Sequence, residues 1–192
     1  MNTLHGKQAL QRLLEGNQRF VASRFQHPHQ TPERRMELLS GQQPFAVIVG
    51  CSDSRIPPEV IFDLGLGDIF VIRTAGNILD DVGLGSLEYA VEHLHVPLIL
   101  VLGHENCGAV TAALQGGEAH GHLGSLLTAI QPAVSQAKTQ TGNMLENAIK
   151  ANMTRIVEQI KTTEPILSKA VQDGSVDVIG AYYHLESGKV SV

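Results

Sequence analysis

The chain of 192 residues has only two cysteines, too few for a disulfide framework. No apolar run reaches the roughly 20 residues that a membrane-spanning helix needs. Positive charge is also scarce, because 14 lysines and arginines face 19 acidic residues. This balance argues against a surface for nucleic acid or for an anionic membrane. We therefore expect neither nucleic acid nor a membrane as a partner.

The first ten residues contain His5 and Lys7 and lack the apolar stretch of a signal peptide. We therefore expect a cytoplasmic protein, whose two thiols stay reduced and suit a metal. Hydrophobic residues make up 43% of the chain, enough for one domain with a full core. We expect a single domain over residues 1–192, with an N-terminal helical arm at 1–41 and an α/β core at 42–192.

Buried-strand patterns alternate with helical patterns through the core. Strands are predicted at residues 45–50, 68–74, 98–103 and 176–183, and helices at 58–64, 83–94, 107–114, 125–138, 143–161 and 165–172. This alternation predicts an α/β fold with a mostly parallel sheet of four strands flanked by helices. A turn at residues 186–189 leads into residues 190–192, which we expect to add an antiparallel edge strand.

Two amphipathic helices are expected before the core, at residues 7–23 and 32–40. They have no position in the sheet, yet each must bury its apolar face somewhere. The pattern leaves both a partner subunit and the chain's own sheet open as the cover. Our fold prediction adopts the partner subunit.

Two short motifs follow two of the predicted strands, Cys51-Ser52-Asp53-Ser54-Arg55 and His104-Glu105-Asn106-Cys107. The carboxyl ends of parallel strands are where such sheets bind ligands. Two cysteines and one histidine there make a zinc site with three protein ligands and an open fourth position, the catalytic arrangement. The alternative is that Cys51 and Cys107 are buried apolar thiols and His104 is a hydrogen-bonded loop residue.

Asp53 and Arg55 alternate with Cys51, so an extended segment would project all three side chains to one side. A carboxylate beside zinc either accepts a hydrogen bond at the open position or occupies that position itself. A bidentate pair with Arg55 would hold Asp53 ionised and away from the metal. We therefore expect Asp53 to be a fourth ligand only in a closed state. The alternative is an ordinary surface ion pair.

With these motifs the chain resembles the β-class carbonic anhydrases, whose pattern is C-x-D-x-R followed by H-x-x-C. Residues 71–77 and 86–91 resemble the family too. The resemblance implies one Zn²⁺ per subunit, held by Cys51, His104 and Cys107, with Asp53 and Arg55 as a catalytic pair. It also implies reversible hydration of carbon dioxide to bicarbonate and self-association as a homodimer or a dimer of dimers.

The resemblance further implies a substrate pocket, built partly from the neighbouring subunit. Gln42, Phe70, Tyr89 and Gly108 occupy the matching positions. By pattern alone, Phe70 and Tyr89 read equally well as core residues. The chain has no tryptophan, which one branch of the family uses in a regulatory bicarbonate site. It therefore resembles the plant-like branch, which has an open zinc site.

Two other functions are compatible with the same motifs. One is hydrolysis of carbon disulfide or carbonyl sulfide at the same zinc site, with access to the pocket deciding the substrate. The other is a non-catalytic binding protein that zinc stabilises.

Overall fold

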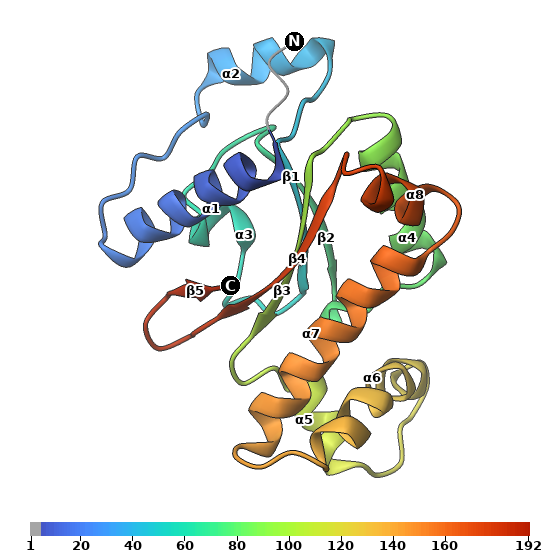
Figure 1. Cartoon of the computed structure of the whole chain (residues 1–192). Coiled ribbons are helices and arrows are strands. Elements are labelled where there is room, and N and C mark those ends of the chain that lie inside the picture. The colour runs from blue at the N-terminus through green and yellow to red at the C-terminus, as the bar shows by residue number, and fades with distance from the viewer. Residues whose placement is uncertain (1–4) are drawn as a thin grey trace.

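A computed structural model describes residues 5–192 of the protein. The first four of the ten N-terminal residues that we compared with a signal peptide lie outside the described residues. In the described part, five strands form one sheet in the order β2-β1-β3-β4-β5 (Figure 1). The strands are β1 (Ala46–Cys51), β2 (Ile69–Thr74), β3 (Leu98–His104), β4 (Asp177–Tyr183) and β5 (Val190–Ser191). The first four are parallel and β5 is antiparallel, which confirms the predicted fold class.

Helices lie on both faces of this sheet (Figure 1). They are α1 (Gly6–Val21), α2 (Pro32–Glu37), α3 (Pro58–Ile61), α4 (Asp81–Glu92), α5 (Gly108–Gln115), α6 (Leu123–Ala137), α7 (Met144–Thr162) and α8 (Ile166–Gln172), with short 3₁₀ turns η1 (Leu38–Ser40) and η2 (Ala75–Asn77). None of the helices in residues 5–192 is long and apolar enough to cross a membrane.

Alternate residues of β1 and β3 feed two hydrophobic cores, one on each face. Ile48 and Leu100 belong to the core that includes Phe62 of the α3 side, and Val49 and Val101 belong to the core that includes Ile160 of α7. Both strands are buried along their whole length. Parallel strands covered on both faces read as continuous apolar runs, which is why the sequence located them.

Helix α1 buries its apolar face on its own chain, the cover that our fold prediction did not adopt, and packing of the N-terminal helices on a partner subunit stays a prediction. Ala9 and Leu13 are fully buried in the core beside Phe62. Burying a leucine contributes roughly 1.5–3 kcal/mol to the free energy of unfolding. The apolar spacing of α1 correctly indicated a buried face but carried no information about which surface covers it. Helix α2, in contrast, has no buried residue within the part of the chain described.

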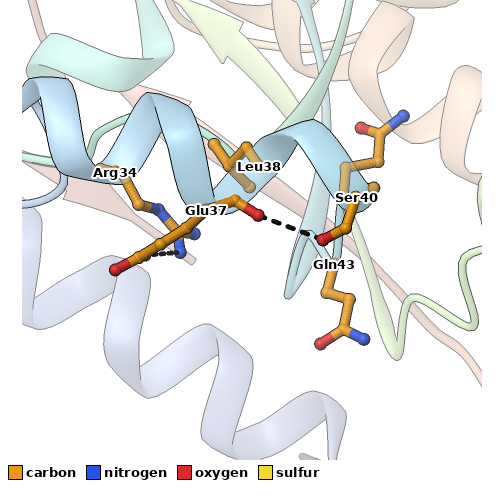
Figure 2. Close-up of a pocket in the computed structure, with 7 residues that line it drawn as sticks. Arg34, Glu37, Leu38, Ser40 and Gln43 are labelled. Carbon is orange, nitrogen blue, oxygen red and sulfur yellow. Dashed lines mark hydrogen bonds and ion pairs between the residues drawn. The ribbon is translucent and has the colours of Figure 1, made fainter.

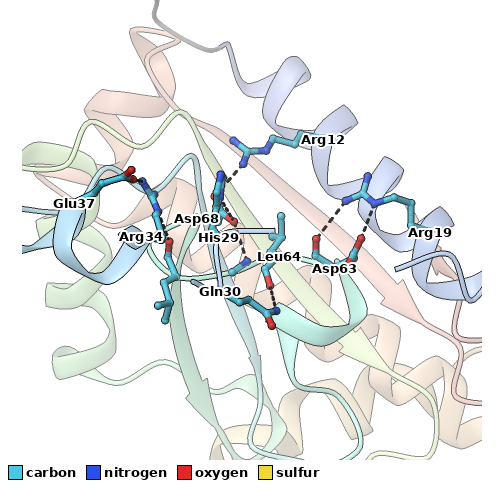
Figure 3. Close-up of polar contacts among 11 residues, drawn as sticks. Arg12, Arg19, His29, Gln30, Arg34, Glu37, Asp63, Leu64 and Asp68 are labelled. Atoms are coloured by element: carbon cyan, nitrogen blue, oxygen red, sulfur yellow. Dashed lines mark hydrogen bonds and ion pairs between the residues drawn. The ribbon is translucent and has the colours of Figure 1, made fainter. Parts of the chain in front are cut away.

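Two buried carboxylates fasten the connection between α1 and α2 to the body (Figure 3). Asp63 accepts hydrogen bonds from Arg19 Nε at 2.6 Å and from the backbone amides of Gln26 and His27, each at 3.0 Å. Burial alone would raise the pKa of Asp63, but the guanidinium and the two amides outweigh it and lower the pKa. Asp68 accepts hydrogen bonds from Arg12 Nη2 at 2.9 Å and from His29 Nδ1 at 2.8 Å.

We predict that Asp63→Asn lowers the free energy of unfolding at pH 7 by roughly 1.5–3 kcal/mol, the usual range for hydrogen bonds to a charged group. Because the pKa of Asp63 is lowered in the folded protein, its charge stabilises the fold above about pH 4. That contribution is lost as the pH falls, so the difference in free energy of unfolding between the parent and Asp63→Asn should shrink. Urea unfolding of both proteins from pH 7 to below about pH 4 measures this difference. A difference that stays constant over that range would contradict the prediction. Glu146→Gln, which removes an exposed pair with Lys150, is the matched control and should cost under about 1 kcal/mol.

Candidate metal centre

The two predicted motifs meet at one edge of the sheet. Cys51 pairs with Thr74 of β2, and β3 lies directly on the other side of β1. The predicted strands ended one residue too early, because pairing with β2 and β4 keeps Cys51 and His104 within their strands as the last residues. Cys107 then caps α5 after a tight turn in which Asn106 has φ of 52°. The ends of β1 and β3 and the start of α5 therefore supply the three donor side chains.

The donor atoms of Cys51, His104 and Cys107 lie within 4.8 Å of one another, and all three residues are buried. The two sulfur atoms are 4.0 Å apart. Two sulfurs bound tetrahedrally to one zinc ion at about 2.3 Å would be about 3.8 Å apart. The spacing of the two thiols therefore already suits a shared metal ion.

His104 is oriented as a metal-binding histidine. Its Nδ1 lies 2.9 Å from the carbonyl oxygen of Glu105, a contact that places the ring proton on Nδ1. Its Nε2 is buried and has no hydrogen-bond partner among residues 5–192. A carbonyl acceptor on one ring nitrogen, with the other nitrogen free, is the usual orientation of histidines that bind zinc. The alternative of a fully hydrogen-bonded loop histidine therefore does not hold.

The charge of the two thiols also fits a dication. A hydrogen bond from Cys107 lowers the pKa of Cys51, and the thiolate favoured at Cys51 raises the pKa of Cys107. Protein groups alone therefore stabilise a single negative charge on the pair. A bound Zn²⁺ would supply the positive charge that two adjacent thiolates require. Thiolate and imidazole are ligands that zinc prefers, so the residues present fit the metal.

Asp53 and Arg55 form a bidentate pair beside this cluster. Arg55 Nε donates to Asp53 Oδ1 at 2.9 Å and Arg55 Nη2 donates to Oδ2 at 2.7 Å. The predicted extended segment is wrong, because the chain turns here and the Arg55 amide also donates to Asp53 Oδ1. The guanidinium hydrogen bonds hold the pKa of Asp53 well below its usual range. Asp53 is therefore an anion that Arg55 orients.

Sequence reasoning assigned no role to Arg73 of β2 or to Gly76 of η2, yet both contact the residues of the cluster. Arg73 of β2 donates to the carbonyl oxygens of Cys51 and Asp53, at 2.8 and 2.6 Å. The backbone amide of Gly76 donates to Cys51 Sγ at 3.2 Å. Gly76 and Asn77 form the turn that follows β2, a third parallel strand. The position of this turn at the carboxyl edge of the sheet could have indicated that its residues belong to the site.

Of the four residues expected to bind substrate, only Gly108 lies at the cluster of its own chain. Phe70 pairs with Val47, four residues before Cys51, so it lies roughly 13 Å from Cys51 along the strand direction. Tyr89 of α4 lies beside Phe70, with ring centroids 6.4 Å apart, and it is 47% exposed. Both are on the side of β2, an edge strand of the sheet.

Gln42 lies at the far end of β1 from Cys51, and the length of the strand separates them by about 20 Å. It is exposed and lines a hollow of about 420 Å³. Arg34 and Ser40, labelled in Figure 2, line the same hollow. Gly108 is the first residue of α5, next to Cys107. A Cβ added at Gly108 would meet no atom of residues 5–192 within 4 Å apart from its chain neighbours and the backbone of its own helix, so the space beside it is open.

Comparison with known proteins identifies the family. The model of the carbonic anhydrase family matches residues 46–190. The chain is 42% identical over 181 residues to carbonic anhydrase 2 of Mycobacterium tuberculosis, covering 92% of this chain and 87% of the relative. It is 39% identical over 184 residues to a carbonic anhydrase of Mycolicibacterium smegmatis, covering 94% and 89%.

Solved structures give the same result. A tetrameric β-carbonic anhydrase of Sordaria macrospora superimposes with a TM-score of 0.73 at 27% identity, covering 95% of both chains. The β-carbonic anhydrase CafA of Aspergillus fumigatus gives a TM-score of 0.73 at 31% identity, covering 95% of this chain and 89% of the other. The fold, the Cys-His-Cys cluster and these relatives agree, and the chain belongs to the β-carbonic anhydrases, zinc enzymes that interconvert carbon dioxide and bicarbonate.

Proposed function

We propose that Cys51, His104 and Cys107 hold the zinc ion with which this carbonic anhydrase hydrates carbon dioxide. The observation that carries the assignment is the buried, unpaired Nε2 of His104 beside two thiols. Zinc bound by three protein ligands supplies Lewis acidity, which makes a nucleophile from water at accessible pH. Stopped-flow hydration of carbon dioxide, with and without a chelator and alongside metal analysis, tests the proposal. Hydration that survives complete removal of zinc would refute it.

We assign Asp53 and Arg55 to orientation within the site. Arg55 occupies both carboxylate oxygens of Asp53, which keeps that side chain paired and leaves the fourth position next to the cluster open. Asp53 can then accept a hydrogen bond from the reacting water, and the open space beside Gly108 can admit substrate. If Arg55 released it, Asp53 would be free to become the fourth ligand of a closed state.

We further propose that Gln42, Phe70 and Tyr89 complete the site of a second copy of the chain. Their separation from their own Cys51 supports this, because roughly 13–20 Å is too far for contact with a small substrate. Tyr89 is half-exposed and Gln42 is exposed, so both are accessible to a partner subunit. A homodimer or a dimer of dimers would place them there, and the Sordaria relative is tetrameric.

Complementation between two inactive variants tests this arrangement. We expect Cys51→Ser and Gln42→Ala to be weakly active as pure proteins. In a mixed dimer, one site would combine the intact metal ligands of the second variant with the intact Gln42 of the first. Mixing the two after reversible dissociation should therefore restore hydration, up to half the parental activity per mixed dimer. If Gln42 serves its own chain, no mixed dimer contains an intact site, and the mixture will stay as inactive as its components.

A further inference from the structure

The turn after β2 places a hydrogen-bond donor on one of the sulfur atoms. Gly76 has φ of +70°, a left-handed conformation that favours glycine, and its amide donates to Cys51 Sγ. A Cβ there would also lie 3.0 Å from Ile130 Cδ1, tighter than ordinary contacts. The Gly76 amide therefore points at Cys51 Sγ only while the turn keeps this backbone conformation.

One buried side chain of a distant helix holds that turn. Asn152 of α7 is only 3% exposed, and its Nδ2 donates to the carbonyl oxygen of Gly76 at 2.8 Å. The carbonyl and the amide of Gly76 belong to two peptide planes that meet at its Cα, so Asn152 acts on the amide through the φ and ψ angles of this turn. Asn152 itself is not one of the clustered metal-binding residues.

We propose that Asn152 is a positioning residue for the metal centre, acting through Gly76 on the sulfur of Cys51. A hydrogen bond to a thiolate stabilises its charge and limits the electron density that it gives to a metal. This matters most when two thiolates already cancel the charge of the ion. Partners of metal ligands commonly change metal affinity or activity 10- to 100-fold when they are removed. The inference rests on the proposed role of Cys51 as a zinc ligand.

The experiment compares Asn152 with a second buried asparagine that holds backbone elsewhere. Asn17 of α1 is also 3% exposed and donates to the carbonyl oxygens of Ile61 and Gly188. Asn152→Leu, Asn152→Ala and Asn17→Leu are each prepared with zinc and with Co²⁺ in its place. Zinc affinity is measured by competition with a chromophoric chelator, the thiolate-to-cobalt absorption band by spectroscopy, and stability by urea unfolding.

Both Asn152 variants should bind zinc up to about 10-fold more weakly, at the low end of the range for groups that contact a metal ligand directly, and should shift the cobalt absorption band. Asn17→Leu should lose stability while keeping the parental affinity and band. Should the leucine variant fail to fold, the smaller alanine side chain carries the test. Parental zinc affinity with an unshifted band in a folded Asn152 variant would overturn the inference, whether or not hydration changes. If the proposed function itself were wrong, Cys51→Ser would bind zinc and Co²⁺ as tightly as the parent does. That result distinguishes its failure from a failure of the inference about Asn152.

Discussion

Replacing Cys51 with serine should remove zinc and carbon dioxide hydration together. A hydroxyl is a poor substitute for a thiolate at a borderline-soft metal. Cys51 is also one of only three clustered donors among residues 5–192, so its loss leaves His104 and Cys107 alone in the cluster. We expect zinc affinity to fall by more than about 100-fold, the upper end of the range for groups that contact a ligand and not the metal itself.

Metal analysis and stopped-flow hydration of the same preparation measure both effects of Cys51→Ser. Ser52→Ala is the matched control, because Ser52 is the next residue, is exposed and is absent from the cluster. It should keep the full zinc content and parental turnover. Full zinc occupancy in Cys51→Ser would show that the ligand assignment is wrong.

Replacing Arg55 with alanine should separate metal binding from turnover. Asp53 would lose both guanidinium hydrogen bonds and keep only the backbone amide of residue 55. It would then be free to swing to the fourth position and exclude water. Zinc should stay bound, since Arg55 is not among the clustered donors, while hydration should fall by about 100-fold, a typical cost of misplacing a catalytic group.

Arg55→Lys is the informative comparison for this prediction. Lysine keeps the positive charge but cannot form the planar, bidentate contact with a carboxylate. We expect its turnover to lie between that of the parent and that of Arg55→Ala, with zinc content unchanged in all three proteins. Near-normal turnover in Arg55→Ala would show that the pair has no part in the reaction.

The sequence by itself specified the sheet and the chemistry of the cluster. Strands buried on both faces read as apolar runs, as in residues 46–50 and 98–103, because a polar side chain between two layers of helices is costly unless a partner satisfies it. Cys51, His104 and Cys107 were found because each follows or ends such a run and each belongs to a donor type that zinc prefers. A parallel sheet then places the carboxyl ends of both runs at one edge.

Only the tertiary structure decided what surrounds the cluster. The cover of α1 and the contact from Asn152 to Gly76 join residues far apart in the chain, and such contacts leave no periodic pattern in a sequence. The turn at Arg55 was missed for a related reason, since alternation predicts sides only while the chain stays extended. Strand register likewise fixed the distance between Phe70 and Cys51, because pairing sets how far along the sheet each residue lies. Sequence patterns determine which faces are buried and which atoms can bind a metal, whereas long-range packing determines which groups meet there.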